Sequence, residues 1–106
     1  MLFFDPTLSR DSSISCSSCH LPEFAFSDNK QFSIGIHGQL GDRNAPSLAN
    51  VAYAFPLLRD GGKKTLEAQI INPIEAEDEM GFNILELLER LKNDENYPRL
   101  FQEAFN

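Results

Sequence analysis

The fold of this chain is decided by the stretch Cys16-Ser17-Ser18-Cys19-His20. The pattern Cys-x-x-Cys-His is typical of the attachment site of a c-type haem. Residues three or four positions apart share one face of a helix, so the two cysteine sulfurs would lie along one porphyrin edge, where vinyl groups accept thioether bonds. His20 follows directly and can place its imidazole under the ring as the proximal iron ligand. The pentapeptide therefore predicts a covalently bound haem c.

Two other kinds of site use cysteines at this spacing. A zinc site would need both cysteines and both histidines of the chain, Cys16, Cys19, His20 and His37. Because His20 is adjacent to a proposed ligand, tetrahedral closure around zinc would be awkward. A thioredoxin-like dithiol would be expected within a βαβ pattern, and the sequence shows none. Both alternatives stay open from the pentapeptide alone, with haem c favoured.

Bulk composition is that of one globular domain. The 106 residues are 42% hydrophobic and 24% charged, with nine phenylalanines and a net charge of −7. This charge argues against nucleic acid and anionic membranes and suits a basic docking partner. No apolar run approaches the ~20 residues of a membrane span, and no signal peptide is recognised at the first residues. Covalent haem attachment usually takes place outside the cytoplasm, so we expect a periplasmic protein.

Helical signals dominate the chain, and no β alternation is convincing. Helices are predicted over 14–20, 46–53, 65–71, 83–93 and 97–105. The third is expected to stop near Pro73, and Asn44 is a candidate cap for the second. The fourth has an apolar stripe of Ile84, Leu87, Leu88 and Leu91, and the fifth is expected to bury Leu100, Phe101 and Phe105. We expect residues 21–43 to form a long irregular loop supported by the cofactor, and residues 60–62 to form a turn.

Several segments together resemble the bacterial di-haem cytochrome c peroxidase family, which includes the methylamine-utilisation di-haem enzymes. They follow the family's order along nearly the whole chain: Leu2-Phe3-Phe4-Asp5-Pro6, Ile14-Ser15-Cys16-Ser17-Ser18-Cys19-His20, Phe24-Ala25-Phe26-Ser27-Asp28, Arg43-Asn44-Ala45-Pro46-Ser47-Leu48, Asp60-Gly61, Thr65-Leu66-Glu67 with Gln69, Pro73-Ile74, and Glu79-Met80-Gly81. The resemblance is to the N-terminal haem domain, which the family uses for peroxide. It implies one such domain over residues 1–106, with the second haem domain absent from this chain.

The resemblance also implies roles for individual residues. Glu79 resembles the acid of the distal haem pocket, and Gln69 resembles a pocket glutamine ten residues earlier. A carboxylate there can move a proton between the oxygens of peroxide. On residues alone, Glu79 lies in an acidic run that would ordinarily be a solvated face. Asn44 resembles a residue that helps to bind calcium between the two domains of the full-length protein.

The ligand on the open face of the iron has two candidates. His37 lies in the glycine-rich loop, near the position where some members of the resembled family have a distal histidine that leaves on activation. The competing interpretation is an ordinary loop histidine. Met80 follows His20 by sixty residues, a spacing similar to that of single-haem electron-carrier cytochromes. The competing interpretation of Met80, which we favour, is a core methionine beneath the haem.

The sequence departs from the family where many members have phenylalanine and tryptophan before the Asp-Gly pair. Leu58 and Arg59 stand there instead. The tryptophan is thought to help electrons pass between the two haems, so its replacement puts the complete peroxidase cycle in question. Arg59 could instead pair with a haem propionate.

These observations predict an all-α, cytochrome c-like helical domain wrapped around one covalent haem. The expected function is the peroxide-reducing half of a cytochrome c peroxidase-like enzyme, with hydrogen peroxide as substrate and a small cytochrome c or cupredoxin as electron donor. The alternatives are a non-catalytic electron-transfer domain and a haem-free fragment without activity. No nucleic acid partner and no membrane span are expected.

Overall fold

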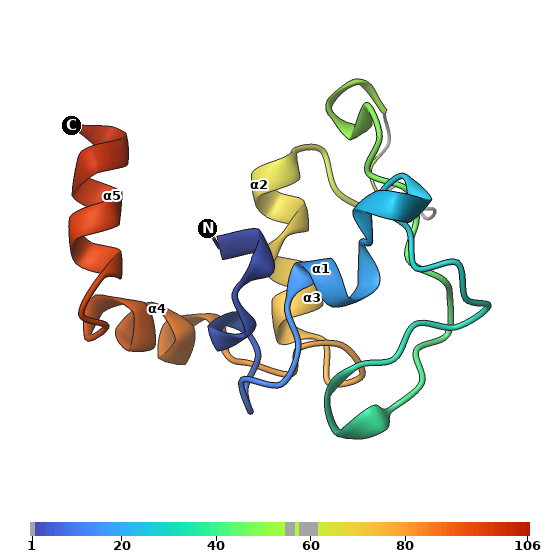
Figure 1. Ribbon diagram of the computed structural model, residues 1–106, viewed down its shortest axis with the longest axis horizontal. Helices are drawn as coiled ribbons and strands as arrows, with labels where there is room; N and C mark the ends of the chain where they lie inside the picture. The colour runs from blue at the N-terminus through green and yellow to red at the C-terminus, as the bar shows by residue number, and fades with distance from the viewer. Residues whose placement is uncertain (1, 55–56, 58–61) are drawn as a thin grey trace.

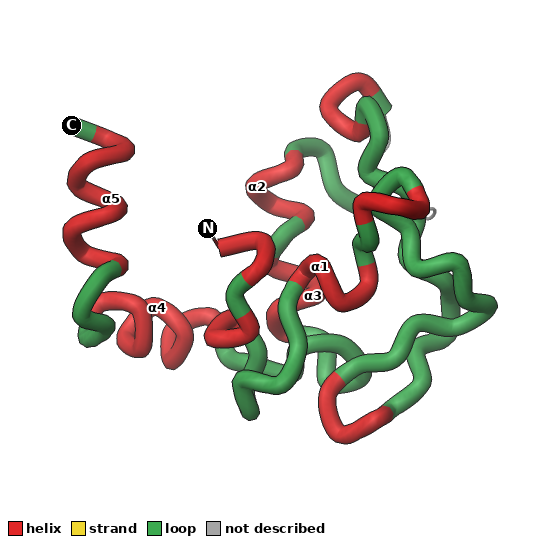
Figure 2. The backbone as a smooth tube through the Cα atoms, in the orientation of Figure 1, coloured by secondary structure: helices red, strands yellow, loops and turns green. Residues whose placement is uncertain are grey.

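The computed structural model describes residues 2–54, 57 and 62–106. Within these ranges the chain forms short helices joined by long irregular segments, and it has no strand (Figure 2). The helices are α1 (Cys16–Cys19), α2 (Leu66–Gln69), α3 (Ile71–Glu75), α4 (Ile84–Lys92) and α5 (Tyr97–Phe105). Single 3-10 turns lie at Leu2–Phe4, Pro6–Leu8, Pro22–Phe24, Ile36–Gly38 and Val51–Tyr53. The expected all-α class is confirmed for the described residues.

The elements are arranged around α1, α2 and α3, which lie in the middle of the molecule (Figure 1). The long segment between α1 and α2 extends to one side, and α4 and α5 form an arm on the other. Residues 21–43 are irregular as expected, apart from two short 3-10 turns and the isolated bridges Leu21↔Ser27 and Ile34↔Leu40. No helix in the described ranges is long and apolar enough to cross a membrane.

Helix α4 begins where its cap predicts. The Asn83 side-chain oxygen accepts hydrogen bonds from the backbone N–H groups of Leu85 at 2.9 Å and Glu86 at 3.3 Å. Leu87 and Leu91 turn inward and are buried, whereas Leu88, expected in the same stripe, is 45% exposed. The two inward leucines join the main core, which also contains Leu8, Ile74, Met80, Phe82 and Tyr97.

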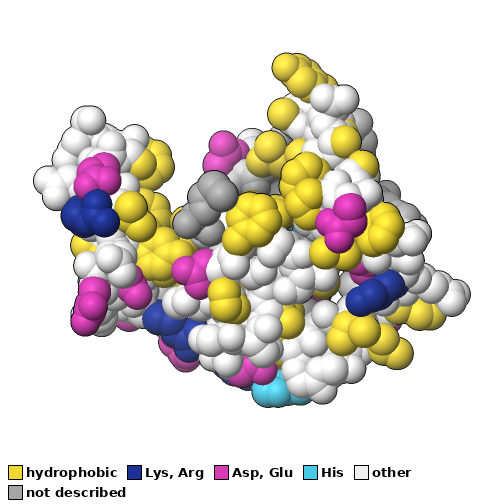
Figure 3. Space-filling view, in the orientation of Figure 1, with side chains coloured by type: hydrophobic (Ala, Val, Ile, Leu, Met, Phe, Trp, Pro, Cys, Tyr) yellow, Lys and Arg dark blue, Asp and Glu magenta, His cyan; other side chains and the backbone are white. Residues whose placement is uncertain are grey.

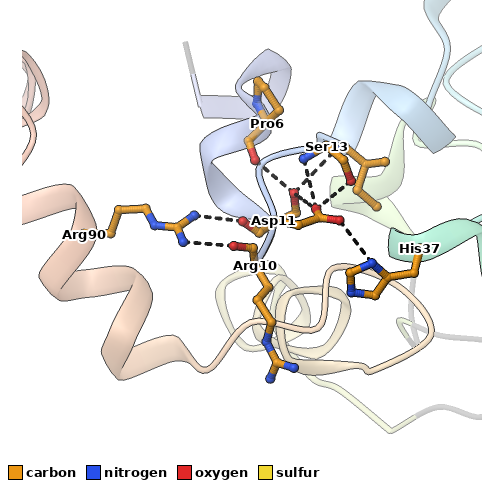
Figure 4. Close-up of polar contacts among 8 residues, drawn as sticks. Pro6, Arg10, Asp11, Ser13, His37 and Arg90 are labelled. Carbon is orange, nitrogen blue, oxygen red and sulfur yellow. Dashed lines mark hydrogen bonds and ion pairs between the residues drawn. The ribbon is translucent and has the colours of Figure 1, made fainter.

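Arg90 ties α4 to the N-terminal segment. Its Nη1 donates to the carbonyl oxygens of Thr7 and Ser9, each at 2.9 Å. Its Nη2 donates to the carbonyl oxygen of Arg10 at 3.0 Å (Figure 4). The same guanidinium lies over the ring of Phe82, 4.0 Å from its centroid. One side chain thus satisfies three carbonyl groups of a segment that has no ladder of its own.

Helix α5 has the expected bounds, but most of its apolar face is not buried, contrary to expectation. Tyr97 in the first turn packs in the core, while Leu100, Phe101 and Phe105 are 40%, 39% and 80% exposed. Amphipathic spacing identifies an apolar face, but it does not supply the surface that covers it. In Figure 3, α5 stands apart from the body, with hydrophobic side chains on the side facing it.

The prediction of a helix over 46–53 is wrong, because the only helical part of this range is a 3-10 turn at Val51–Tyr53. The Ser47 hydroxyl donates to the carbonyl of Ala25 at 2.5 Å and accepts from the N–H of Ala49 at 3.1 Å. These bonds, together with a left-handed φ of 56° at Asn50, hold the segment in a non-helical path. Asn44 therefore does not cap a helix.

Two other helix boundaries also differ. Helix α1 is shorter than 14–20, and the helical path does not stop near Pro73, since Pro73 lies inside α3. It occupies the third position of α3, where a backbone N–H would have no acceptor within the helix, so proline costs little there. The expected turn at 60–62 rests on Asp60 and Gly61, which lie outside the described residues, as do Leu58 and Arg59.

Candidate haem-binding site

Helix α1 places the two cysteines of the attachment motif three residues apart. The N–H of Ser15 donates to the Ser18 hydroxyl at 3.0 Å, which supports the first turn. Cys16 and Cys19 are half-buried free thiols, and Cys19 Sγ lies 3.8 Å from the carbonyl oxygen of Ile34. Burial raises the pKa of both thiols, so they are neutral at pH 7. Both are available to form thioether bonds on one side of a short helix.

His20 ends α1 with its ring already oriented. Its Nδ1 lies 2.7 Å from the carbonyl oxygen of Phe26. When Nδ1–H donates to a carbonyl, Nε2 keeps its lone pair and is free to bind a metal. The acceptor is set by a tight turn, in which Ala25 and Phe26 have left-handed φ values of 53° and 60°. Sequence analysis missed this role of Phe26, because a carbonyl acceptor leaves no mark on residue type.

An open apolar pocket of about 360 Å³ adjoins this histidine, and its lining is Phe3, Phe4, Phe26 and Leu48. The Phe3 ring is close to the rings of both residues of this hydrogen bond, with its centroid 6.5 Å from that of His20 and 6.0 Å from that of Phe26. Nearly apolar walls beside a metal-competent imidazole suit a flat hydrophobic macrocycle. The residues present therefore fit a haem.

Gln69, the last residue of α2, supplies an unpaired acceptor. The helix begins at Thr65, whose hydroxyl accepts from the N–H of Ala68 at 3.2 Å. The Gln69 Oε1 atom is buried and has no hydrogen-bond partner among the described residues. A buried acceptor without a donor costs free energy, so such an atom is typical of a place where a bound molecule donates. The pocket role of Gln69 stays a prediction.

Glu79 is held by its backbone in the loop that follows α3. Its N–H donates to the carbonyl of Ala76 at 3.0 Å, and its own carbonyl accepts from the N–H of Ile36 at 2.8 Å. Glu79 is exposed, yet desolvation by the surrounding protein, followed by the Asp78 charge, raises the pKa of its carboxyl group. The Glu79 charge also contributes to raising the pKa of Cys19, so the acid lies within electrostatic reach of the attachment motif.

The two candidates for the open iron face have other contacts in this structure. His37, in a left-handed conformation with φ 57°, places Nδ1 3.5 Å from Asp11 Oδ2, and its side chain is 60% exposed (Figure 4). Met80 is 4% exposed and packs in the core with Ile74 and Phe82. The structure thus places His37 against the N-terminal loop and Met80 in the core.

The remaining candidates concern metals other than haem iron. Asn44 is half-buried and interacts with another part of the protein. The zinc alternative would require the two cysteines and two histidines to converge, but within residues 2–54, 57 and 62–106 no three metal-ligating side chains come together.

Comparison with known proteins was made on sequence and on structure. The family model for the di-haem cytochrome c peroxidase matches residues 1–106. The methylamine utilization protein MauG of Methylorubrum extorquens is 40% identical over 98% of this chain and 30% of its own length. The cytochrome c551 peroxidase of Nitrosomonas europaea is 42% identical over 76% of this chain and 24% of its own length. The chain thus spans about a third or less of these relatives.

Solved structures give the same family. The diheme peroxidase BthA of Burkholderia thailandensis superposes with a TM-score of 0.87 at 29% identity, covering 98% of this chain and 30% of that one. A MauG-like protein associated with microbial copper homeostasis superposes with a TM-score of 0.73 at 39% identity, covering 98% and 31% of the two chains.

Proposed function

Because this chain belongs to the di-haem cytochrome c peroxidase family, we propose that residues 1–106 form the peroxide-reducing haem domain of such an enzyme. The family is one of haem oxidoreductases, and haem c is its cofactor. In the proposed domain, Cys16 and Cys19 hold the haem through thioether bonds and His20 binds the iron. The family's second haem domain lies on a further part of the full-length protein.

The observation that carries this proposal is the hydrogen-bonded state of His20. Its Nδ1 lies 2.7 Å from the Phe26 carbonyl oxygen. Of the two free thiols, Cys19 directly precedes His20 in the chain and Cys16 lies four residues before it. Orientation of a metal-binding histidine by a carbonyl is the usual arrangement around protein-bound metals. The buried Gln69 Oε1, which has no hydrogen-bond partner among the described residues, supports the binding of a molecule that donates a hydrogen bond to it.

The proposed reaction is H₂O₂ + 2e⁻ + 2H⁺ → 2H₂O. When bound, the haem supplies the redox chemistry that breaks the O–O bond. The protein then has to hold peroxide and relocate a proton. We assign proton transfer to Glu79, whose carboxylate takes the proton of one peroxide oxygen and returns it to the other, which leaves as water. Gln69 Oε1 accepts a hydrogen bond from peroxide and keeps it oriented.

The electrons come from a small redox protein, a cytochrome c or a cupredoxin. A net charge of −7 favours a donor with a basic docking surface. In the full-length protein the second haem domain passes these electrons on, and Asn44 contributes to calcium binding between the two domains. Covalent haem attachment supports a periplasmic location. Similarity to methylamine utilization proteins supports, as a second candidate, oxidation of a different substrate by the same haem.

The test compares two neighbouring acids in the ferric holo-protein. Glu79→Gln preserves size and hydrogen bonding but cannot carry a proton, so the stopped-flow rate with H₂O₂ should fall by about 10²–10⁴-fold. Glu77→Gln is the control, because Glu77 is exposed and makes only a 3.7 Å ion pair with Arg10. Haem content should be equal in both variants. If both react like the unaltered protein, Glu79 belongs to a solvated acidic run and the peroxidase assignment fails.

A further inference from the structure

Gly35 lies where no side chain can be accommodated. A Cβ atom placed on it would be 2.0 Å from the carbonyl oxygen of Asp78 and 2.8 Å from that of Glu79. Both are backbone atoms, so no side-chain rotation would relieve the contact. The φ of Gly35 is −87°, which any residue adopts. Glycine is therefore required at position 35 because its backbone lies against the backbone of Asp78 and Glu79, and Glu79 bears the proposed proton-transfer group.

The residue after it adds a second contact to the same loop. Ile36 is 1% exposed, and its N–H donates to the Glu79 carbonyl at 2.8 Å. Its side chain lies over Gly81, where an added Cβ would be 2.5 Å from Ile36 Cδ1. Gly35 and Ile36 therefore contact residues on both sides of Glu79 as well as Glu79 itself. The turn over residues 35–39 is stabilised by a hydrogen bond from the N–H of Gly35 to the carbonyl oxygen of Gln39 at 2.8 Å.

The opposite side of this loop is anchored to α3 and to the N-terminal segment. The N–H of Met80 donates to the carbonyl oxygen of Pro73 at 3.1 Å, and the N–H of Gly81 donates to the carbonyl oxygen of Ala76 at 2.8 Å. On the N-terminal side, the backbone N–H of Arg10 donates to the carbonyl oxygen of Met80 at 3.0 Å. Among the described residues, the Glu79 carboxylate itself has no hydrogen bond or ion pair. Its position is therefore set by its backbone and by what packs against that backbone.

We propose that Gly35 and Ile36 are positioning residues for Glu79, holding its backbone so that its carboxylate reaches peroxide. This inference rests on the proposed function. Real Cβ atoms essentially never approach within 3.0 Å of such neighbours, so an alanine at position 35 must push the Asp78–Glu79 backbone away by about 1 Å. A misplacement of that size at a reacting group can cost about 10²-fold in rate.

The experiment uses ferric holo-protein with Gly35→Ala and a matched control, Gly41→Ala. Gly41 lies in the same loop, but a Cβ there would make only ordinary contacts, at 3.7 Å from Ser33 O and 3.8 Å from Asp78 Oδ2. Gly35→Ala should slow the stopped-flow reaction with H₂O₂ by about 10²-fold, and Gly41→Ala should leave it unchanged. Imidazole binding to the iron, which needs no proton transfer from Glu79, should be equal in all three proteins.

A double mutant separates positioning from general damage. If Gly35 acts only through Glu79, then Gly35→Ala adds no further loss once Glu79→Gln is present, whereas independent effects multiply. Amide hydrogen exchange provides a readout that does not depend on activity: the Ile36 N–H should exchange faster in Gly35→Ala than in the unaltered protein. If Gly35→Ala does not fold, Ile36→Val, which trims the atom over Gly81, should give a smaller loss of the same kind.

Two results would overturn the inference. One is a Gly35→Ala protein that reacts like the unaltered one while Glu79→Gln is slow, which leaves the proposed function in place. The other is a loss from Gly35→Ala that persists in full in the Glu79→Gln background, which assigns Gly35 a structural role only. If Glu79→Gln itself is as fast as the unaltered protein, the proposed function fails first and the positioning role fails with it.

Discussion

Nδ1 of His20 lies 2.7 Å from the carbonyl oxygen of Phe26, which directs Nε2 away from the polypeptide turn that supplies the acceptor. The ring is oriented by a backbone group, so substitution of the Phe26 side chain alone would leave the acceptor in place. The two thiols of α1 lie in the same motif. The oriented imidazole and the two thiols together predict how substitutions in α1 should affect haem attachment.

Covalent attachment depends on both cysteines. In protein matured with haem-attachment machinery, Cys16→Ala or Cys19→Ala should weaken retention of haem on a denaturing gel, and loss of both should abolish it, since each thiol forms one thioether bond. Ser17→Ala, in the same helix, is the control and should retain full haem staining. Haem that runs free of the unaltered polypeptide would contradict covalent attachment.

Substitution of His37 should not change the spectrum of the ferric holo-protein. The imidazole lies against Asp11, whose pKa is lowered chiefly by hydrogen bonds from Ser13 and to a smaller extent by His37. His37→Ala should therefore keep the same spin state and the same rate of cyanide binding. Conversion from low spin to high spin with faster cyanide binding would establish His37 as an iron ligand.

Met80 should behave as a core residue. It is 4% exposed among apolar side chains, so Met80→Leu, which conserves volume, should cost less than about 1.5 kcal/mol and Met80→Ala about 2–5 kcal/mol in free energy of unfolding. Neither change should alter the optical spectrum. A spectrum altered by both Met80 variants but not by His37→Ala would show a methionine ligand and would favour the electron-carrier alternative. Denaturant titration and absorption spectroscopy provide the two measurements.

Tyr97 and Asp5 should give the protein a pH-dependent stability. The Tyr97 hydroxyl donates to Asp5 Oδ2. Hydrogen bonds from Thr7 and then Tyr97 lower the pKa of Asp5, while burial and the Asp5 interaction raise that of Tyr97 to about 12. Tyr97→Phe should lower the free energy of unfolding at pH 7 by about 1 kcal/mol.

The difference between Tyr97→Phe and the unaltered protein should shrink at both extremes of pH. The Asp5 contribution is present above its unfolded pKa of about 4 and is lost as the pH falls through the lowered folded value. The Tyr97 contribution is present below its unfolded pKa of about 10 and is lost as the pH rises towards about 12. Tyr53→Phe, at a residue 87% exposed, is the control. A difference that stays constant from acid to alkaline pH would contradict the assignment.

Arg90 should be among the most sensitive positions for stability. Arg90→Ala leaves the carbonyl groups of Thr7, Ser9 and Arg10 without their donor and removes the cation over Phe82. We expect a loss of about 2–4 kcal/mol in free energy of unfolding, and Arg90→Lys should recover little because it lacks the planar fork of donors. Arg99→Ala, which breaks only an exposed pair with Glu103, should cost no more than about 1 kcal/mol. Equal losses at the two arginines would contradict this.

The local signals in the sequence were sufficient where a short stretch controls its own conformation. Asn83 accepts bonds from the next N–H groups, so α4 begins where the cap predicts, and α5 has the expected bounds. The haem motif likewise depends on spacing within five residues. Capping and helical periodicity act over one or two turns, and a linear sequence displays interactions of that range directly.

Only the tertiary structure decided which surfaces meet. Some features depend on segments that are distant in sequence: Phe105 is exposed, and Ser47 donates a hydrogen bond to Ala25. Others depend on backbone atoms: the Phe26 carbonyl accepts from His20, and Gly35 lies close to the Asp78 carbonyl. Backbone carbonyl groups are the same in every residue, so residue type cannot reveal which one will orient a histidine or exclude a side chain. For the same reason, the sequence could indicate Glu79 as a candidate for proton transfer, through its resemblance to the family, but could not show which residues contact its backbone.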